Sequence, residues 1–460
     1  MISPSLPAKP LSWLSLFRLG LVQTALGAIV VLTTSTLNRV MVVDLALPAA
    51  LPGLLVGLHY AVQLSRPRWG HGADTGGRRT PWIIGGVALL AAGALGAAGA
   101  TVLMAGALVA GIALAFVAFV AIGLGVGMAG TNLLALIATR TAPARRPAAA
   151  TLAWLMMIAG IAVTAGVAGQ LLDPYSPERL MAVAAGICAV ALTLTIAGVT
   201  GIERRAHRPM TPPIPAPTPM TEGAAAPSFA EALREVWADG QARRFTIFVL
   251  VSMLAYAAQD LILEPFAGHV FGYTVGESTT LSSTQHGGVF AGMLLTGIVA
   301  SVWGRGRPGF LRVWCVGGCI LSALSLVLLA VGAQSSETWP LDLNVFALGA
   351  SNGAFAVAAI SSMMALASAD ARGGQSGGRE GIRMGLWGAA QAIGFGAGGL
   401  LGALGVDAAR ALIPDTATAY GTVFTAEAAL FLVASLLAAR AGRRLAAPPV
   451  PANASLMPGE

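Results

Sequence analysis

Residues 107–138 read ALVAGIALAFVAFVAIGLGVGMAGTNLLALIA, a run without a single charged side chain. An α-helix rises ~1.5 Å per residue, so about 20 such residues cross a hydrocarbon core of ~30 Å. The whole chain of 460 residues shares this character, with 56% hydrophobic residues, 10% charged residues and a mean hydropathy of +0.76. A water-exposed surface needs far more charge. The sequence therefore predicts an all-α polytopic membrane protein.

Apolar stretches on either side of this run predict twelve transmembrane helices in two sets of six. Residues 202–243 separate the sets and are expected to form a cytoplasmic linker with one short amphipathic helix. This division predicts an N-terminal six-helix bundle over 1–201, a C-terminal six-helix bundle over 244–440 and a cytoplasmic tail over 441–460. The predicted spans lie near 19–38, 48–65, 82–103, 107–138, 148–172, 180–201, 245–264, 286–303, 311–332, 343–368, 382–405 and 419–439.

The placement of arginine predicts the orientation, because basic residues in short loops are retained on the cytoplasmic side. Of the 27 basic residues, only Arg39, Arg179 and Arg410 fall in loops on the side opposite the linker. An even number of spans returns the chain to the side on which it began. We therefore expect both termini to be cytoplasmic.

A short loop after the second predicted span reads GHGADTGGRR over residues 70–79. The spacing of Gly70, Asp74, Gly77, Arg78 and Arg79 resembles the loop motif G-x-x-x-D-x-x-G-R-[KR] of the major facilitator superfamily. The resemblance implies a major-facilitator-like fold of six plus six helices and a conformational latch in this loop. Glycines permit a tight turn, and an aspartate can cap a helix or pair with arginine. The alternative is a charged turn that only fixes the topology.

Four further stretches, in both halves, carry a narrower resemblance. They are TLNRVMVVD at 36–44, QDLILEPF at 259–266, the stretch 352–364 that begins NGAF, and GIRMGLWGAAQ at 381–391. Together they resemble the PucC/LhaA proteins of purple phototrophic bacteria, the bacteriochlorophyll-delivery branch of the superfamily. The loop DTGGRRTPW at 74–82 is more similar to the LhaA branch, which serves the core antenna.

This resemblance implies an assembly factor for light-harvesting complexes in the intracytoplasmic photosynthetic membrane, which is part of the bacterial inner membrane. Bacteriochlorophyll is the implied cargo, bound transiently. The implied partners are antenna polypeptides, the reaction centre and membrane lipids. Nucleic acid is not expected, because the chain has no basic cluster with interleaved aromatic residues.

Charged residues in or beside spans are the next candidates, because an unpaired charge is costly in hydrocarbon. Asp260 and Glu264 are four residues apart, hence on one helical face, and Asn38-Arg39 aligns with Gln259-Asp260 in the pseudo-repeat. At ~1.5 Å per residue, Asp260 is expected ~24 Å along the seventh span, near the outer surface. We predict that these five residues form an outer gate or partner contact in which Arg39 pairs with Asp260 or Glu264. Wetted groups that bind the local backbone are the alternative.

Pigment-binding candidates follow from the need of magnesium for an axial ligand, which a histidine, a carbonyl, an amide or water can supply. His59 is the one histidine inside a predicted span and is either such a ligand or a hydrogen-bonded interior residue. Asn352 and Gln391 are polar positions in apolar helices, and the Trp387 ring is able to stack on a macrocycle. Interhelical hydrogen bonds and interface anchoring explain these three equally well.

Neither an enzyme nor a metal site of its own is expected. The sequence has no phosphate-binding loop, no nucleophile elbow and no metal-spaced set of histidine and cysteine. Two function classes follow: the assembly factor, and a secondary transporter of a small amphiphile driven by protons through Asp260, Glu264 or Glu427. The first six predicted spans offer no acidic residue at mid-membrane depth, which favours the assembly role.

Overall fold

The computed structural model describes residues 11–66, 69, 78–142, 145–203, 234, 237–303, 309–371 and 379–441. Within these ranges, eleven helices are long and apolar enough to cross a membrane, and a shorter apolar helix covers Ala50–Ser65. The predicted all-helical membrane fold is confirmed. The second span is shorter than predicted. It consists of α3 (Ala50–Val62) and one 3₁₀ turn (Gln63–Ser65), which follow the non-helical segment Leu45–Pro48.

The helices of the N-terminal half begin and end within several residues of the predicted spans, with one exception. The first span starts at Trp13 and continues through two π-helical segments, Leu32–Thr36 and Val40–Asp44, so that it ends well beyond the predicted residue 38. Besides α3, the helices of this half are α1 (Trp13–Val31), the short α2 (Leu37–Arg39), α5 (Thr80–Met104), α6 (Leu108–Arg140), α7 (Arg146–Leu172) and α8 (Pro177–Val199).

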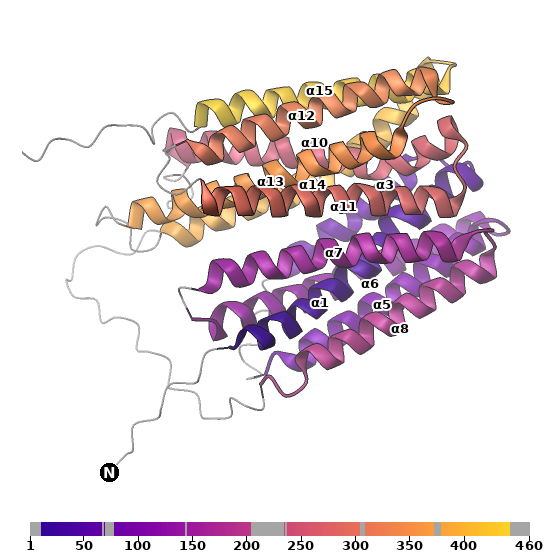
Figure 1. The fold of residues 1–460 in the computed structure, drawn as a ribbon. Coiled ribbons are helices and arrows are strands. Elements are labelled where there is room, and N and C mark those ends of the chain that lie inside the picture. The colour runs from indigo at the N-terminus through magenta and orange to yellow at the C-terminus, as the bar shows by residue number, and fades with distance from the viewer. Residues whose placement is uncertain are drawn as a thin grey trace, which may run out of the picture.

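The C-terminal half repeats the plan with six long helices that lie roughly alongside one another (Figure 1). They are α10 (Gly240–Phe271), α11 (Val275–Val302), α12 (Phe310–Gly332), α13 (Leu341–Ala371), α14 (Arg379–Leu412) and α15 (Thr416–Ala441). Large apolar side chains such as Val109, Val117 and Leu343 are exposed on the outer faces of the helices. Hydrocarbon accepts such side chains at no cost, so this surface is that of a multi-pass membrane protein.

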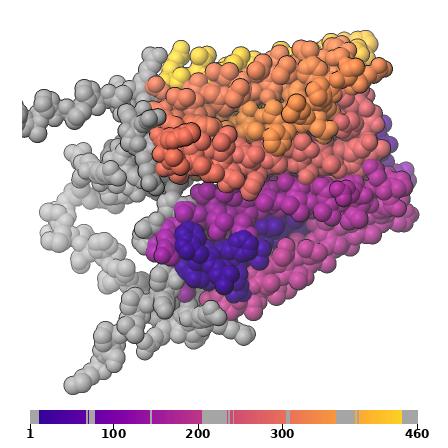
Figure 2. Space-filling model, in the orientation of Figure 1, coloured from indigo at the N-terminus to yellow at the C-terminus, as the bar shows by residue number. Residues whose placement is uncertain are grey.

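Two pairs of helices join the halves: α7 packs against α11, and α3 packs against α14. Figure 2 shows the first pair as a seam between the magenta and the orange-red surfaces. Close approach is possible because Gly169 of α7 faces Gly276 of α11, where a Cβ atom on Gly169 would lie 2.6 Å from the Gly276 carbonyl oxygen. Small residues give membrane helices this proximity. We call the end of the molecule where this contact lies the Arg39 end, and the opposite end, where α8 ends and α10 begins, the linker end.

The seventh span corrects a prediction about depth. It was expected to end at residue 264, but α10 continues to Phe271 with Pro265 inside it. The helix extends past the proline because the Phe266 ring packs against Tyr420 and Phe424 of α15. Asp260 consequently has about three further turns of helix, roughly 16 Å, between it and the Arg39 end. It lies inside the helix bundle and not near the outer surface.

Candidate functional site

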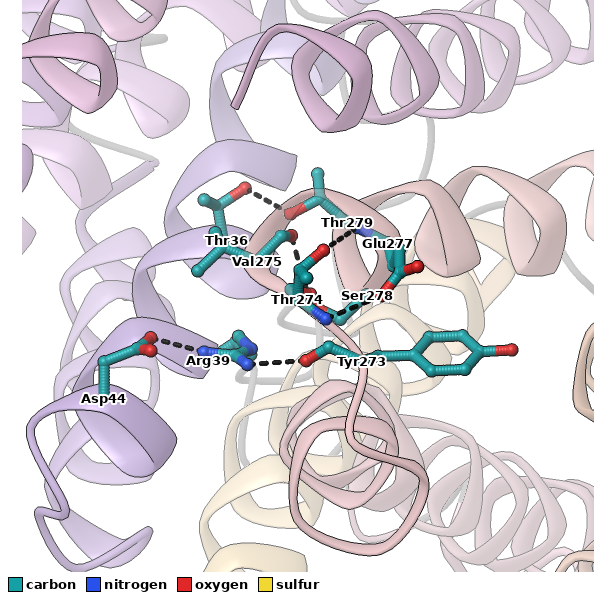
Figure 3. A network of polar contacts seen from close by, with 9 residues as sticks. All are labelled: Thr36, Arg39, Asp44, Tyr273, Thr274, Val275, Glu277, Ser278 and Thr279. Atoms are coloured by element: carbon teal, nitrogen blue, oxygen red, sulfur yellow. Dashed lines mark hydrogen bonds and ion pairs between the residues drawn. The ribbon is translucent and has the colours of Figure 1, made fainter. Parts of the chain in front are cut away.

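The end of the first span connects the two halves. The π-helical segments flank Asn38 and Arg39, and π-helical turns in membrane and soluble proteins are frequent at functional sites. From this stretch, Ser35 donates a short hydrogen bond to Glu264 of α10, and the Asn38 amide donates to the Leu261 carbonyl at 2.7 Å. Thr36 adds a hydroxyl contact of 3.2 Å with Thr279 of α11 (Figure 3). The first span is therefore tied to both α10 and α11.

Arg39 is 4% exposed and has two partners (Figure 3). One terminal nitrogen forms an ion pair with Asp44, and the other donates to the Tyr273 carbonyl at 2.7 Å. The predicted ion pair of Arg39 with Asp260 or Glu264 was wrong, because Asp44 is the carboxylate that binds Arg39. The charge of Arg39 nevertheless acts on the Glu264 carboxylate. In a π-helix the hydrogen bonds run from residue i to i+5, so the wider turn brings residue 44 under residue 39. Arg39 still joins the halves, through a backbone carbonyl in the loop between α10 and α11.

The predicted acidic face of α10 divides into two environments. Glu264 is buried against the first span, where Ser35 is its donor. Asp260 is partly exposed and accepts a hydrogen bond of 3.2 Å from Gln285 of α11. Gln259 is fully buried, and its amide has no hydrogen-bond partner among the described residues. Only Glu264 of these three therefore lies at the contact with Asn38 and Arg39.

Two carboxylates that sequence reasoning missed also join the halves at the Arg39 end. Asp407, near the end of α14, accepts from the backbone N–H groups of Ala49 and Ala50 at 2.9 and 2.7 Å, at the start of α3. Asp173, just after α7, accepts from the Thr274 hydroxyl at 3.0 Å, at the start of α11. Helix N-termini attract negative charge. We call Asp407 and Asp173, with these contacts, the two carboxylate clasps.

The clasps occupy equivalent places in the two halves, since α7 and α14 are each the fifth span of their half. Each half thus sends one carboxylate to the beginning of a helix in the other half. The receiving end of α11 is further stabilised by a capping box, in which Thr274 and Glu277 bind each other's backbone N–H groups (Figure 3). In the sequence, the signal was an aspartate at or near the end of an apolar run, in LGVDAAR and GQLLDPY.

The loop motif is only partly within the described residues: Gly70, Asp74 and Gly77 lie outside them. Of the remaining two, Arg78 is exposed, and the Arg79 backbone N–H donates to Glu203 at 2.8 Å. Thr80 N–H donates to the same carboxylate at 2.9 Å, so Glu203, just after α8, caps the start of α5. Burial opposes its charge, but the hydrogen bonds from Thr80 and Arg79 outweigh it and lower the pKa of Glu203.

His59 is hydrogen-bonded inside the N-terminal half. Its Nε2 is 2.9 Å from the amide nitrogen of Gln63, four residues further along the chain. The ring is buried, and Gln63 in turn accepts from Arg66. The alternative of a hydrogen-bonded interior histidine therefore describes this residue. His59 is also not the one histidine inside a span, because His286 lies within α11.

The other three pigment candidates differ in exposure. Asn352 is fully buried and accepts from the Ser322 hydroxyl at 2.8 Å. Trp387 is 1% exposed, and its ring packs edge-on against Phe245 with centroids 5.1 Å apart. Gln391 alone is partly exposed. Asn352 and Trp387 thus belong to the packed interior of the C-terminal half.

Five aromatic rings form a continuous row from the N-terminal half into the C-terminal half. Tyr60 of α3 stacks on Phe395 of α14 at 6.0 Å, and Phe395 meets Tyr256 of α10 at 5.6 Å. The row continues through Phe355 at 6.3 Å to Phe431 at 5.7 Å. Tyr60, Phe395 and Tyr256 are partly exposed, whereas the last two rings are buried. We call these five residues the aromatic row.

An acidic residue, Glu427, lies beside the aromatic row. Glu427 of α15 is four residues before Phe431 and interacts electrostatically with Asp260. It is 3% exposed, and neither carboxylate oxygen has a hydrogen-bond partner among the described residues. The C-terminal half therefore encloses two acidic groups without a basic partner in the described part of the chain.

A family model described as PUCC protein matches residues 36–445. The chain belongs to this family. It is 54% identical to the "Bacteriochlorophyll synthase 44.5 kDa chain" of Rhodobacter capsulatus, covering 93% of this chain and 95% of that protein. It is 30% identical to "Protein PucC" of the same organism, covering 91% and 90%. The predicted family is confirmed, and within it the chain is more similar to the first of these relatives than to PucC.

Solved transporter structures share the fold. A bacterial homologue of the human lysosomal transporter Spinster, in an inward-facing and unoccupied conformation, has a TM-score of 0.64 at 17% identity. The peptide transporter POT has a TM-score of 0.66 at 16% identity. Both matches cover 95% of this chain and 98% of the other. The major-facilitator-like fold of the PUCC family member is thereby confirmed.

Proposed function

We propose that this protein is an assembly factor for the photosynthetic core antenna, which binds bacteriochlorophyll and delivers it to antenna polypeptides. The observation that carries the proposal is the 54% identity, over 93% of the chain, to a relative named for bacteriochlorophyll. The fold supports it, because transporter-like bundles enclose a binding surface between two halves that can move apart. The protein acts as a carrier and not as an enzyme.

The contacts between the halves suit such a carrier. The ties of Ser35, Asn38 and Arg39 and the two carboxylate clasps all lie at the Arg39 end. A bundle pair held together at one end is able to accept an apolar cargo between the halves toward the other end. The antenna polypeptides, the reaction centre and membrane lipids are the proposed partners. The intracytoplasmic membrane is the proposed location, with both chain ends in the cytoplasm.

One observation favours a second candidate, a proton-coupled transporter of a small amphiphile. Asp260 and Glu427 are enclosed acidic groups that interact with each other, and no basic partner for them occurs among the described residues. Such groups in membrane proteins are frequently proton carriers. Glu264 differs in that its Oε1 accepts from Ser35 in the tie between the halves, while its Oε2 has no hydrogen-bond partner among the described residues.

Deletion of the gene in a phototrophic host tests the proposed function. Core-antenna absorbance should fall while transcripts of the antenna genes persist, and the wild-type chain supplied in trans should restore it. Glu427→Gln removes the charge of an acid whose two carboxylate oxygens have no hydrogen-bond partner among the described residues, and this variant should restore antenna absorbance as well as wild type does. Unchanged antenna absorbance after deletion contradicts the assembly role. Restoration that fails with Glu427→Gln alone, at equal expression, favours the transporter.

A further inference from the structure

Three rings of the aromatic row pack against the cores of the two halves and still keep part of their surface exposed. Tyr60, Phe395 and Tyr256 come from three helices, α3, α14 and α10, and meet at the junction of the two halves. Ring faces in a row favour a flat, conjugated ligand, because aromatic pairs gain energy from stacked and edge-on contacts beyond their burial.

Polar groups stand one helical turn from two of these rings. Gln391 precedes Phe395 by four residues on α14, and Asp260 follows Tyr256 by four residues on α10, so each pair shares a helix face. Both polar residues are partly exposed, like the rings beside them. The surface therefore combines an apolar, aromatic floor with a carboxylate and an amide at its margin.

Asp260 has the chemistry of a ligand for a hard metal ion. Its Oδ1 accepts from Gln285, which orients the carboxylate, and Oδ2 accepts no hydrogen bond from the part of the chain that the structure describes. No arginine, lysine or histidine pairs with it among the described residues. A carboxylate in this setting gains from any cationic centre that reaches it. Magnesium prefers oxygen ligands of this kind.

We propose that Tyr60, Phe395, Tyr256, Gln391 and Asp260 form the pigment site, in which Asp260 supplies the axial oxygen ligand to the magnesium of bacteriochlorophyll. The inference rests on the proposed function and deepens it by naming the site. It also replaces the sequence-based candidates. His59 is buried with its Nε2 engaged by Gln63, and Asn352 and Trp387 are enclosed in the core.

Paired titrations of the purified full-length protein test the site. Bacteriochlorophyll and the same pigment with its magnesium replaced by two protons differ only at the metal, so an axial ligand shows as a preference for the first. Wild type should prefer the magnesium pigment. Asp260→Ala should abolish this preference and leave both pigments bound equally. Phe395→Leu, which retains bulk but loses the ring, should weaken both pigments roughly twofold to tenfold.

Matched variants separate the site from general damage. Phe116→Ala removes a ring that is 38% exposed on α6, away from the site, and should bind both pigments as wild type does. A preference for magnesium that survives Asp260→Ala, or unchanged affinity in Phe395→Leu, overturns the proposed site. A wild-type protein that binds neither pigment contradicts the proposed function itself.

Discussion

The carboxylate of Asp407 in the C-terminal half binds the backbone N–H of Ala50 in the N-terminal half at 2.7 Å. This contact caps the first turn of α3 with a charge from the opposite bundle, and Asp173 makes the counterpart contact with Thr274. A helix that borrows its cap from another bundle loses that cap when the bundles separate. The Asp407 clasp therefore links the stability of α3 to closure of the Arg39 end, whereas α11 has its own capping box and the Asp173 clasp adds a hydrogen bond between the halves.

Removing the clasps should open this end. A hydrogen bond to a charged group contributes about 1.5–3 kcal/mol, so Asp407→Ala or Asp173→Ala should shift the equilibrium toward the open state roughly tenfold or more. The probe is labelling of Thr279→Cys, a position that is buried at the contact with Thr36. The native cysteines Cys188, Cys315 and Cys319 are buried.

Asp415→Ala is the matched control for the clasps. Asp415 caps the start of α15 through Thr418, within its own bundle. Its loss should lower thermal stability in detergent without increasing the labelling of Thr279→Cys. Equal labelling in the clasp variants and in this control means that the clasps stabilise single helices and do not hold the halves together.

Arg39 and Asp44 should behave as one unit. Because the ion pair orients the guanidinium toward the Tyr273 carbonyl, Arg39→Ala and Asp44→Ala should each open the Arg39 end, and the double variant should be no worse than either. Arg39→Lys should fail to restore closure, since an ammonium group lacks the planar fork that spans two partners. Labelling of Thr279→Cys measures both effects.

The coupling between Arg39 and Asp260 provides a comparison for the coupling between Arg39 and Asp44. Asp260 lies about three turns deeper than the Arg39 end, so the effects of Asp260→Ala and Arg39→Ala should simply add. Strong coupling between these two, with none between Arg39 and Asp44, would show that the functional partner of Arg39 is the one the sequence predicted.

Gly169 should not tolerate a methyl group. Its missing Cβ allows α7 to approach the Gly276 carbonyl of α11, so Gly169→Ala forces the helices apart or distorts them, at a cost of about 1–3 kcal/mol. Thermal unfolding in detergent measures this loss. Gly99→Ala makes the same chemical change where nothing lies within 4 Å, and should be neutral or stabilising. Similar melting temperatures for both variants would mean that α7 and α11 pack less closely.

Glu203 should make stability depend on pH. Its pKa is lowered below the ordinary value of 4.5 in the folded protein. A depressed carboxyl pKa contributes stability above the unfolded value, and this contribution disappears as pH falls through the folded value. Wild type should therefore exceed Glu203→Gln in thermal stability at neutral pH, and the difference should shrink toward low pH. A constant difference at every pH would show that the carboxylate charge is not what caps α5.

Most of the fold was predictable, because apolar run length decides whether a helix can cross the membrane. The run at 107–138 became α6 with almost unchanged ends. The predicted first and seventh spans were too short, because they end at the polar pair Asn38-Arg39 and just before Pro265. The first span continues as helix because the C-terminal half accepts its polar groups, and α10 continues because Phe266 packs against α15. No local pattern contains that information.

The site was less predictable, because it depends on contacts between distant segments. Arg39 and Asp260 were predictable as site residues from their charge. The π-helical turn that brings Asp44 to Arg39 has no recognisable signature in the sequence. His59 was a candidate by residue type alone, and only its hydrogen bonds exclude it. The aromatic row joins residues from five helices, a juxtaposition that spacing within one helix does not reveal.

If this chain carries bacteriochlorophyll to the antenna, the pigment should accompany the protein when it is purified in mild detergent from a phototrophic membrane. Pigment extraction should then give bacteriochlorophyll in amounts comparable with the protein, and antenna polypeptides should be present in the same fraction. Phe395→Leu should carry less pigment than Phe116→Ala. A wild-type preparation that is folded, active in restoring a deletion strain and free of pigment would contradict the carrier role.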